Sequence, residues 1–350
     1  MEHSLCHNTT FTKRMGYRGK KDKFMNIVCP ALMEDNPKTI ADAMAGTHSI
    51  GMAVKQNVKV YANDIQNYSQ AIGKCVLSPV QNLDPLPIIA KPNFFTNTEK
   101  FWSEIFFTQP QARDIDRIRE SIYHAKTDEA TKACYMNVLL YTVEQLARMP
   151  GQYSGVLKPD NPKSIARSKL NAISKFQENV QSFVNDPTKI KHQVYNLDVA
   201  QFLATIPKVD VIYHDPPYGS HQYTDNYNVP EAISNLDPVK EQSMTYNPKS
   251  KIHALQERKT SPFSSKAKAL SFTDQIMEKT ALKTNRMVWS YSTDPHNSIT
   301  LQHLLDKCNK YFHTCRVCES GFVCHTQQKG TESRKIKEVV IIGTQSKLFP

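Results

Sequence analysis

The sequence places an acidic residue, two prolines and a tyrosine at the end of a short apolar segment. Asp215, Pro216, Pro217 and Tyr218 follow residues 209–213, which are predicted to form a strand. A carboxylate in such a turn can accept a hydrogen bond from the exocyclic amine of a base and offset the positive charge that develops when the nitrogen is alkylated. The rigid prolines leave a backbone carbonyl to accept the second amine hydrogen, and the tyrosine ring offers a stacking face. An ordinary strand-end turn is the alternative interpretation.

A second candidate site lies near the N-terminus, around the segment DAMAGTHSIG. Residues 39–44 read as a strand, the glycine turn leads into a helix, and residues 58–65 read as a second strand. Such a βαβ unit is typical of nucleotide-binding folds, in which the turn and the helix N-terminus face the ligand. Asp64 ends the second strand, where an acidic residue can bind ribose hydroxyls, although a helix N-cap is the alternative role.

Periodicity divides the chain into α/β parts and a helical part. Residues 83–190 carry helical periodicity in four segments, and strand patterns return from Gln193 onward. We therefore expect a catalytic α/β domain formed by residues 14–82 and 191–350, with residues 83–190 as a helical insert. Within the second part, residues 230–265 are polar and rich in lysine and are predicted to be a loop or lid. The segments TCRVCESGFVCHT and KIKEVVIIG are predicted to be antiparallel strands.

Composition narrows the class of protein. Of 350 residues, 44 are Lys or Arg and 33 are Asp or Glu, a formal charge of +11 that suits a polyanionic partner. No apolar run approaches the ~20 residues of a membrane-spanning helix, and the N-terminal residues lack a signal sequence, so we expect a cytoplasmic location. The eight cysteines are expected to be reduced thiols. Cys308, Cys315, Cys318, Cys324 and His325 form an incomplete zinc pattern, and we expect no metal.

Taken together, these motifs resemble those of the S-adenosylmethionine-dependent DNA adenine methyltransferases in the α-type arrangement (Dam-like and Fok-like), and most closely the Fok-like branch. The matching segments are YRGKKDKF, DAMAGTHSIG, VYANDI, NLDVAQFL, DPPYGSHQYTDNYN, SPFSSKAKALSF, MVWSYST and KEVVIIG. The resemblance implies a Rossmann-like methyltransferase sheet, mostly parallel with an antiparallel strand, and a helical insert that recognises the target. It also implies methyl transfer from S-adenosyl-L-methionine to the N6 amine of adenine in double-stranded DNA, within a restriction–modification system.

The resemblance also implies roles for individual residues. The catalytic residues would be Asp215, Pro216, Pro217 and Tyr218. The cofactor-binding residues would be Tyr17, Lys21, Asp42, Ala45, Gly46, Thr47, Asp64, Ile65, Asp198, Val199 and Asp215. The residues near DNA would be Tyr153, Lys158, Tyr223, Asn226, Tyr227 and Lys266. Two positions depart from the family pattern, since Met44 replaces a phenylalanine and His48 stands where a second glycine is usual.

Basic residues of the insert offer a broader set of candidate phosphate contacts, although a solvated helical face is the alternative for each one. They are Arg113, Arg117, Arg119, Lys126, Lys132, Lys163, Arg167, Lys169 and Lys175.

Three other functions remain as alternatives at this point. Adenine in RNA or the N4 amine of cytosine in DNA would need the same chemistry, and a DNA-binding module with a decayed cofactor loop would explain His48. The resemblance is compatible with a companion restriction endonuclease, and it implies neither a stable protein partner nor a membrane.

Overall fold

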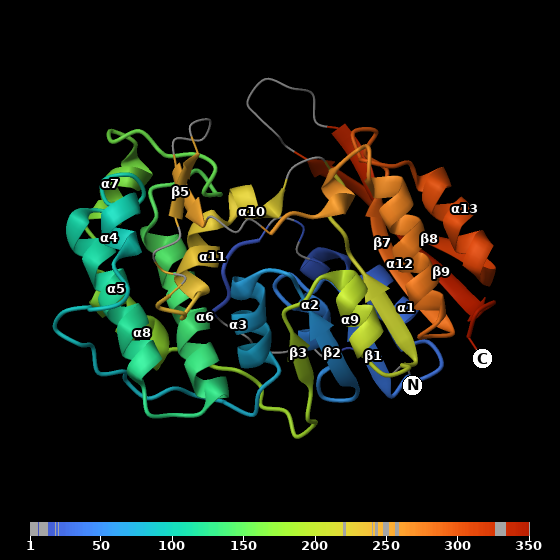
Figure 1. The fold of residues 1–350 in the computed structure, drawn as a ribbon, viewed down its shortest axis with the longest axis horizontal. Coiled ribbons are helices and arrows are strands. Elements are labelled where there is room, and N and C mark those ends of the chain that lie inside the picture. The colour runs from blue at the N-terminus through green and yellow to red at the C-terminus, as the bar shows by residue number, and fades with distance from the viewer. Residues whose placement is uncertain are drawn as a thin grey trace.

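The computed structural model describes residues 6, 13–17, 19, 21–219, 222–239, 241, 244–247, 252–255, 259–325 and 334–349. Its centre is a seven-stranded sheet with strand order β3-β2-β1-β4-β7-β9-β8 (Figure 1). The strands are β1 (Thr39–Asp42), β2 (Lys59–Asn63), β3 (Gln193–Tyr195), β4 (Val211–His214), β7 (Arg286–Ser292), β8 (Phe312–His325) and β9 (Arg334–Ser346).

The sheet is mostly parallel. The pairs β3·β2, β2·β1, β1·β4 and β4·β7 all run in the same direction, whereas β9 is antiparallel to both of its neighbours, β7 and β8. This arrangement confirms the predicted fold class, a mostly parallel methyltransferase sheet with an antiparallel strand.

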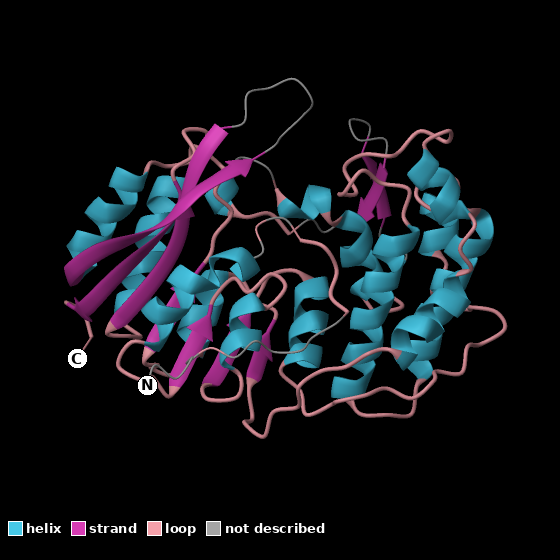
Figure 2. Ribbon diagram, turned by 180° about the vertical axis from the view of Figure 1, so that it is seen from behind, coloured by secondary structure: helices cyan, strands magenta, loops and turns pink. Residues whose placement is uncertain are grey.

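Helices cover both faces of the sheet, which explains why the central strands β4 and β7 are buried along their whole length. Every residue of β4 and β7 is buried. One face packs against α1 (Met25–Met33), α2 (Ser49–Val54) and α3 (Asn67–Val76), and the other against α9 (Val199–Thr205), α12 (Ala269–Ala281) and α13 (Leu301–Tyr311). Figure 2 shows these layers from behind.

A helical block lies beside the β3 end of the sheet (Figures 1 and 2). It contains α4 (Asn97–Trp102), α5 (Gln109–His124), α6 (Glu129–Leu146), α7 (Pro162–Ser168) and α8 (Ala172–Gln181). Side chains of Thr108, Asp128 and Asn171 cap the N-termini of α5, α6 and α8, as their sequence positions favour. All five helices fall within residues 83–190; the division into two domains remains a proposal. Among the described residues, no helix is long and apolar enough to cross a bilayer.

The prediction of a loop or lid over residues 230–265 is wrong for most of the part that the structure describes. This region includes most of helix α11 (Asn228–Ser234), an antiparallel hairpin of β5 (Met244–Asn247) and β6 (Ile252–Leu255), and the 3-10 helix η3 (Pro262–Ser264). Helix α11 packs against α3, α6 and β6. A short helix with no clear periodicity gives little sequence signal, so tertiary packing decided this segment.

A buried guanidinium ties the helical block to α11. Arg119 on α5 is fully buried, and it donates to both carboxylate oxygens of Glu241 at 2.8 and 3.0 Å and to Asp116 at 3.2 Å. It also donates to the backbone carbonyls of Ile233, Ala232 and Asn235, at the end of α11. The Ala232 carbonyl also accepts from the Asn235 N–H at the C-cap, so the arginine supplements the hydrogen bonding of a helix terminus and pairs with two carboxylates.

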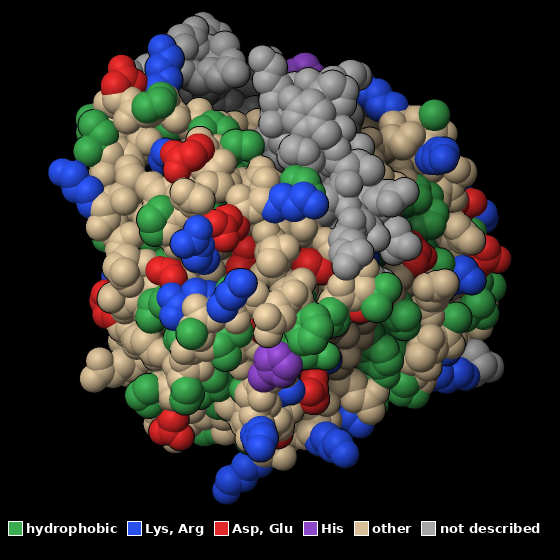
Figure 3. Space-filling model, turned by 60° about the vertical axis from the view of Figure 1, so that its left-hand side comes forward, with side chains coloured by type: hydrophobic (Ala, Val, Ile, Leu, Met, Phe, Trp, Pro, Cys, Tyr) green, Lys and Arg blue, Asp and Glu red, His purple; other side chains and the backbone are tan. Residues whose placement is uncertain are grey.

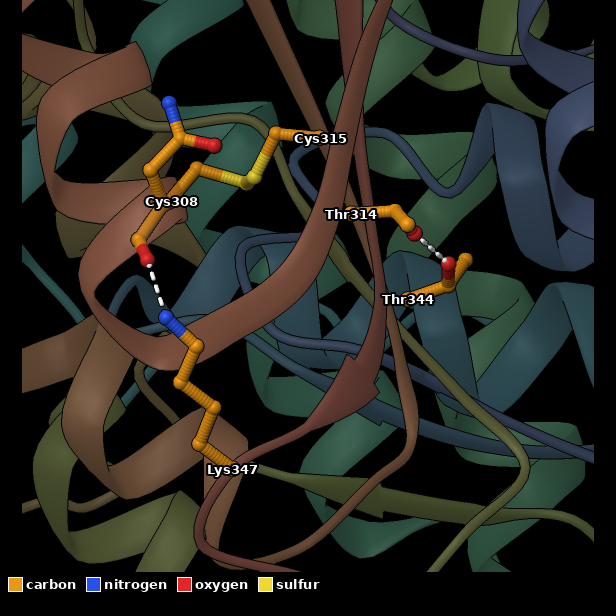
Figure 4. The surroundings of a disulfide bond; sticks show 6 residues. Cys308, Thr314, Cys315, Thr344 and Lys347 are labelled. Carbon is orange, nitrogen blue, oxygen red and sulfur yellow. Dashed lines mark hydrogen bonds between the residues drawn. A yellow bond between two sulfur atoms is a disulfide. The ribbon is translucent and has the colours of Figure 1, made fainter.

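The structure contains two disulfides, Cys6–Cys29 and Cys308–Cys315, so the expectation that all the thiols are reduced is wrong for these four residues. Cys308 lies in α13 and Cys315 in the following strand β8, which brings their Cα atoms to 6.3 Å (Figure 4). Cys318, three residues further along β8, packs on the opposite face of the sheet from Cys315. The strand therefore separates the two cysteines of the CxxC sequence. The side chains of Cys324 and His325 lie outside the described residues.

We predict that Arg119→Met lowers the free energy of unfolding by about 3–5 kcal/mol, because it leaves two buried carboxylates without their cation and removes one donor from three backbone carbonyls. Arg113→Met is the matched control, since Arg113 on the same helix forms an exposed ion pair with Glu99. Denaturant titration of both variants measures the difference. Equal midpoints would show that the buried network does not hold the block in place.

Candidate active site

A single cavity of about 630 Å³ lies at the carboxyl ends of the parallel strands. This is where parallel α/β sheets bind ligands, and the volume is in the usual range of ligand sites. All eleven residues predicted to bind the cofactor line the cavity, as do the four residues of the DPPY turn. The sheet thus brings together motifs that are up to about 200 residues apart in the sequence.

The DPPY turn directly follows β4, and a backbone hydrogen bond holds its last residue. The Ser298 backbone N–H donates to the Tyr218 carbonyl at 2.7 Å, which fixes the end of the turn. Asp215 projects into the cavity, and its Oδ1 accepts from the Tyr218 hydroxyl at 2.8 Å and lies 2.9 Å from the Lys21 ammonium. Burial raises the pKa of Asp215 to about 6, although the charge of Lys21 acts in the opposite direction. The carboxylate is therefore ionised at neutral pH, and proximity to Glu338 contributes to the raised value.

Glu338 is a site residue that the sequence analysis did not identify. It lies on β9 opposite Ser292 of β7, lines the cavity, and its Oε1 is 2.6 Å from the Lys21 ammonium. In the sequence, the signal for Glu338 was an acidic residue directly before the apolar run VVII of a predicted strand. A charged residue next to a buried run needs a partner, but the partner lies 317 positions away, and only the sheet order brings the two together.

Asp42, which ends the strand next to β4, is a buried carboxylate without a matching cation among the described residues. It ends β1 and is 1% exposed, and within the described part of the chain neither oxygen has a hydrogen bond of normal geometry. Burial raises the pKa of Asp42 well above its usual value, as do the charges of Asp215 and Asp64, and the Met44 backbone N–H offsets this only in part. Such a group is costly in an empty site, so it fits a ligand that brings a positive charge.

Asp64 shapes the glycine turn as well as facing the cavity. Its Oδ2 accepts from the Gly46 backbone N–H and its Oδ1 from the Gln66 N–H, each at 2.9 Å. The residue is therefore not the N-cap of α3, which begins after Gln66 and whose first N–H groups donate to Glu231. Each Asp64 oxygen keeps a second lone pair for a ligand hydroxyl.

Asp198, by contrast, is a helix N-cap. Its side chain accepts from the Ala200 N–H at 2.8 Å at the start of α9, and the residue also lines the cavity with Val199. Asp198 thus caps a helix and still faces the cavity, so the N-cap contact is compatible with the predicted cofactor-binding role.

Tyr17 covers the glycine turn. Its ring packs against both Tyr223 and Tyr227, with centroids 5.2 and 5.0 Å away, and these two rings are 6.0 Å from each other. A Cβ atom at Gly46 would lie 2.9 Å from the Tyr17 ring, and Gly46 also has a φ of +52°. Both the backbone conformation and the close aromatic contact therefore require glycine here.

His48 adopts the left-handed conformation that the usual glycine would adopt, with φ 60° and ψ 36°. Its ring does not line the cavity but is fully buried, and its Nε2 lies 2.8 Å from the Ser69 carbonyl. Gly73 on α3 makes room for the ring, since a Cβ there would lie 2.3 Å from His48 Cε1. Burial lowers the pKa of His48 to about 4, so the ring is neutral. The substitution thus leaves the turn intact.

The residues predicted to contact DNA do not lie together. Tyr223 and Asn226 line the cavity, whereas Lys158 and Lys266 are exposed outside it. Tyr227 is buried behind Tyr17 rather than facing the cavity. Tyr153 is 2% exposed and packs edge-on against Phe106, so the prediction that its side chain contacts DNA is wrong. An aromatic residue in a glycine-containing loop does not indicate by itself which way its ring points.

The broader basic set is also divided. Arg119 is part of the buried network described above, and Arg113, Arg117 and Lys175 pair with neighbouring carboxylates. Arg167 donates to backbone carbonyls. Lys126, Lys163 and Lys169 are exposed. The face shown in Figure 3 accordingly carries both basic and acidic side chains.

Comparison with known proteins identifies the family. The chain belongs to the D12 class of N6 adenine-specific DNA methyltransferases, whose model matches residues 17–285. This confirms the resemblance, and it favours adenine in DNA over the RNA, cytosine and non-enzymatic alternatives. Enzymes of this kind use S-adenosyl-L-methionine as the methyl donor.

The relatives include three named methyltransferases. Type II methyltransferase M.NlaIII of Neisseria lactamica is 27% identical over 276 residues, which are 72% of this chain and 76% of the relative. M2.HphI of Haemophilus parahaemolyticus is 28% identical over 230 residues, 59% of this chain and 66% of the relative. M.FokI of Planomicrobium okeanokoites is 22% identical over 253 residues, 64% of this chain but 37% of the relative.

We predict that Gly73→Ala destabilises the protein by about 1–3 kcal/mol, although alanine normally favours a helix, because its methyl group would overlap the His48 ring. His48→Gly in the same chain should remove the conflict, so the double variant should be more stable than the sum of the two single changes predicts. Thermal or denaturant unfolding of all four proteins tests this. Additive effects would mean that the two residues are not in contact.

Proposed function

We propose that this chain transfers a methyl group from S-adenosyl-L-methionine to the N6 amine of adenine at a specific site in double-stranded DNA, as the modification enzyme of a restriction–modification system. The observation that carries the proposal is the continuity of the cavity. One end is lined by the acidic residues of the first three strand ends, and the other by the DPPY turn.

The first end fits the cofactor. Asp42 would face its cationic part, Gly46 and Thr47 would lie against its methionyl part, Asp64 would accept from the ribose hydroxyls, and Asp198 would accept from the adenine amine. The unpaired buried carboxylate of Asp42 is the structural support for this fit. When bound, the cofactor supplies a methyl group on a positively charged sulfur, which leaves as a neutral thioether.

The second end fits a base that has been taken out of the duplex. Asp215 would accept one hydrogen from the exocyclic amine and the Pro216 carbonyl the other, which localises the nitrogen lone pair toward the methyl group. Tyr218 would stack on the base. No covalent intermediate with the chain is needed, because the residues only align the two reactants and stabilise charge.

The helical block and nearby loops would meet the DNA. Tyr223 and Asn226 at the cavity edge would contact the extruded base or its neighbours, and the exposed Lys158 and Lys266 would neutralise phosphates. The proposal that a restriction endonuclease accompanies the chain rests on its relatives, which include the Type II methyltransferases M.NlaIII, M2.HphI and M.FokI.

The function is tested by incubating the purified chain with S-adenosyl-L-methionine and either double-stranded DNA or RNA, followed by digestion and nucleoside analysis. N6-methyladenine from DNA alone is the expected product. N4-methylcytosine, or methyladenine from RNA alone, would refute the proposed substrate. Single-molecule sequencing of the treated DNA would then identify the methylated site.

We predict that Asp42→Asn weakens S-adenosyl-L-methionine binding at least tenfold, because a hydrogen bond or ion pair to a charged group contributes about 1.5–3 kcal/mol. The same change should leave the ligand-free protein as stable as the wild type or more so, because it removes an uncompensated buried charge. Calorimetric titration and thermal unfolding measure the two effects. Unchanged affinity would remove Asp42 from the cofactor site.

We predict that Asp215→Ala abolishes methyl transfer while cofactor affinity stays within about twofold of the wild type, because the carboxylate acts on the amine. Asp306→Ala, on the exposed face of α13, is the control. In the wild type, the rate should fall as the pH drops below about 6, the pKa of Asp215, because the protonated acid no longer offers a charged acceptor. Activity retained in Asp215→Ala would overturn its assignment.

A further inference from the structure

The catalytic carboxylate is one member of a cluster of four groups. Lys21 comes from the N-terminal 3-10 helix η1 (Lys21–Phe24), Asp215 and Tyr218 from the turn after β4, and Glu338 from β9. The Lys21 ammonium lies 2.9 Å from Asp215 Oδ1, 2.6 Å from Glu338 Oε1 and 2.8 Å from the Tyr218 hydroxyl. The Tyr218 hydroxyl in turn lies 2.8 Å from both carboxylates.

The Tyr218 hydroxyl has fewer hydrogens to donate than it has carboxylate acceptors nearby. The three hydrogens of the Lys21 ammonium match its three neighbours, so each can receive one. The Tyr218 hydroxyl carries a single hydrogen, yet two carboxylate oxygens lie within hydrogen-bonding distance of it. The hydroxyl can therefore donate to Asp215 or to Glu338, but not fully to both.

The charges in the cluster are also unequal. One ammonium faces two carboxylates, so the cluster carries a net charge of −1 with both acids ionised. If Lys21 had only Asp215 as a partner, the pair would be neutral and Asp215 would be a weaker acceptor for an incoming amine. Glu338 shares the ammonium and keeps electron density on Asp215.

The backbone of Glu338 is fixed at both sides. Its N–H donates to Ser320 Oγ at 3.0 Å, and the preceding residue, Lys337, accepts from the Thr293 N–H at 3.0 Å. The side chain of Glu338 is 7% exposed, compared with 19% for Asp215. Glu338 is therefore rigidly placed behind the carboxylate that faces the cavity.

We propose that Glu338 is a positioning residue for the methyl transfer. When Asp215 accepts a hydrogen bond from the adenine amine, Glu338 accepts the hydrogen bond from the Tyr218 hydroxyl and keeps its ion pair with Lys21. The inference rests on the proposed function, in which Asp215 binds that amine. When the substrate binds, the adenine amine replaces the Tyr218 hydroxyl as a hydrogen-bond donor to Asp215, and no proton leaves the cluster. Without Glu338, Tyr218 and Lys21 would have Asp215 as their only acidic partner in the cluster and would compete with the substrate for it.

Other groups around Asp215 bear on its charge. Besides Lys21, Tyr218 and Glu338, they are Tyr213 on β4 and Asp42 on β1. The negative charge of Glu338 raises the pKa of Asp215, and the positive charge of Lys21 lowers it. Removing the charge of Glu338 alone should therefore lower the pKa of Asp215.

The test is Glu338→Gln, measured by single-turnover methylation of double-stranded DNA at saturating S-adenosyl-L-methionine over a range of pH. We expect the maximal rate to fall about 10- to 100-fold, the size expected for a lost hydrogen bond to a charged group. Cofactor affinity should stay within twofold of the wild type. The acidic limb of the pH profile should move to lower pH, which a structural defect would not produce.

Two variants serve as controls. Glu319→Gln removes an exposed carboxylate of the neighbouring strand β8, which pairs with Lys337, and should leave the rate and the pH profile unchanged. Glu338→Asp keeps the charge and should recover most of the rate and the wild-type acidic limb. If Glu338→Gln fails to fold, the rate and the acidic limb of Glu338→Asp test the proposal instead.

The proposal is overturned if Glu338→Gln keeps its rate within twofold with an unmoved acidic limb, or if Glu338→Asp loses as much rate as a folded Glu338→Gln. If the proposed function itself is wrong, the assay gives a different result, because the wild type would then produce no N6-methyladenine.

Discussion

The structure depends on a buried ion cluster in which one lysine serves two carboxylates. Lys21, Asp215 and Glu338 come from the beginning, middle and end of the chain, and all three are largely withdrawn from water. Charges in such a setting interact strongly, and removing any one of them leaves the others uncompensated. The cluster therefore ties the order of the strands to the chemistry of the site, because a different order would bury unpaired charges.

Both ends of the cavity hold carboxylates that burial makes costly. For Asp215 the cost is offset by Lys21, whereas Asp42, on the neighbouring strand β1, has no cation of its own among the described residues. The difference fits two kinds of ligand, since a neutral amine needs an acceptor that is already charged and a positively charged cofactor supplies the missing partner. The glycine turn keeps its shape despite His48, because the ring packs into the space beside Gly73 instead of into the cavity.

The helical block is held to the catalytic part by polar contacts as well as apolar packing. Arg119 joins α5 to the end of α11, and Glu231 on α11 receives the first N–H groups of α3. Helix α11 follows the DPPY turn in the chain by about ten residues, after the short helix α10 (Tyr223–Asn226), so two short helices connect the catalytic turn to the block that would meet DNA. This role was hidden in a segment whose composition is typical of a loop.

The sequence alone determined the βαβ unit and the DPPY turn at a strand end, because these follow from local periodicity and turn chemistry, and the resemblance of its motifs to a known family implied the family and the mostly parallel sheet. Asp42, Asp64, Asp198 and Asp215 could be found in this way, since each lies at the end of a strand or within three residues after it. Tertiary structure alone decided that Tyr153 points inward, that Arg119 is buried, that Cys315 and Cys318 face opposite sides of the sheet, and that Glu338 reaches Lys21. Those outcomes depend on contacts between residues far apart in the chain, and local sequence carries no record of which distant group fills a given space or meets a given charge.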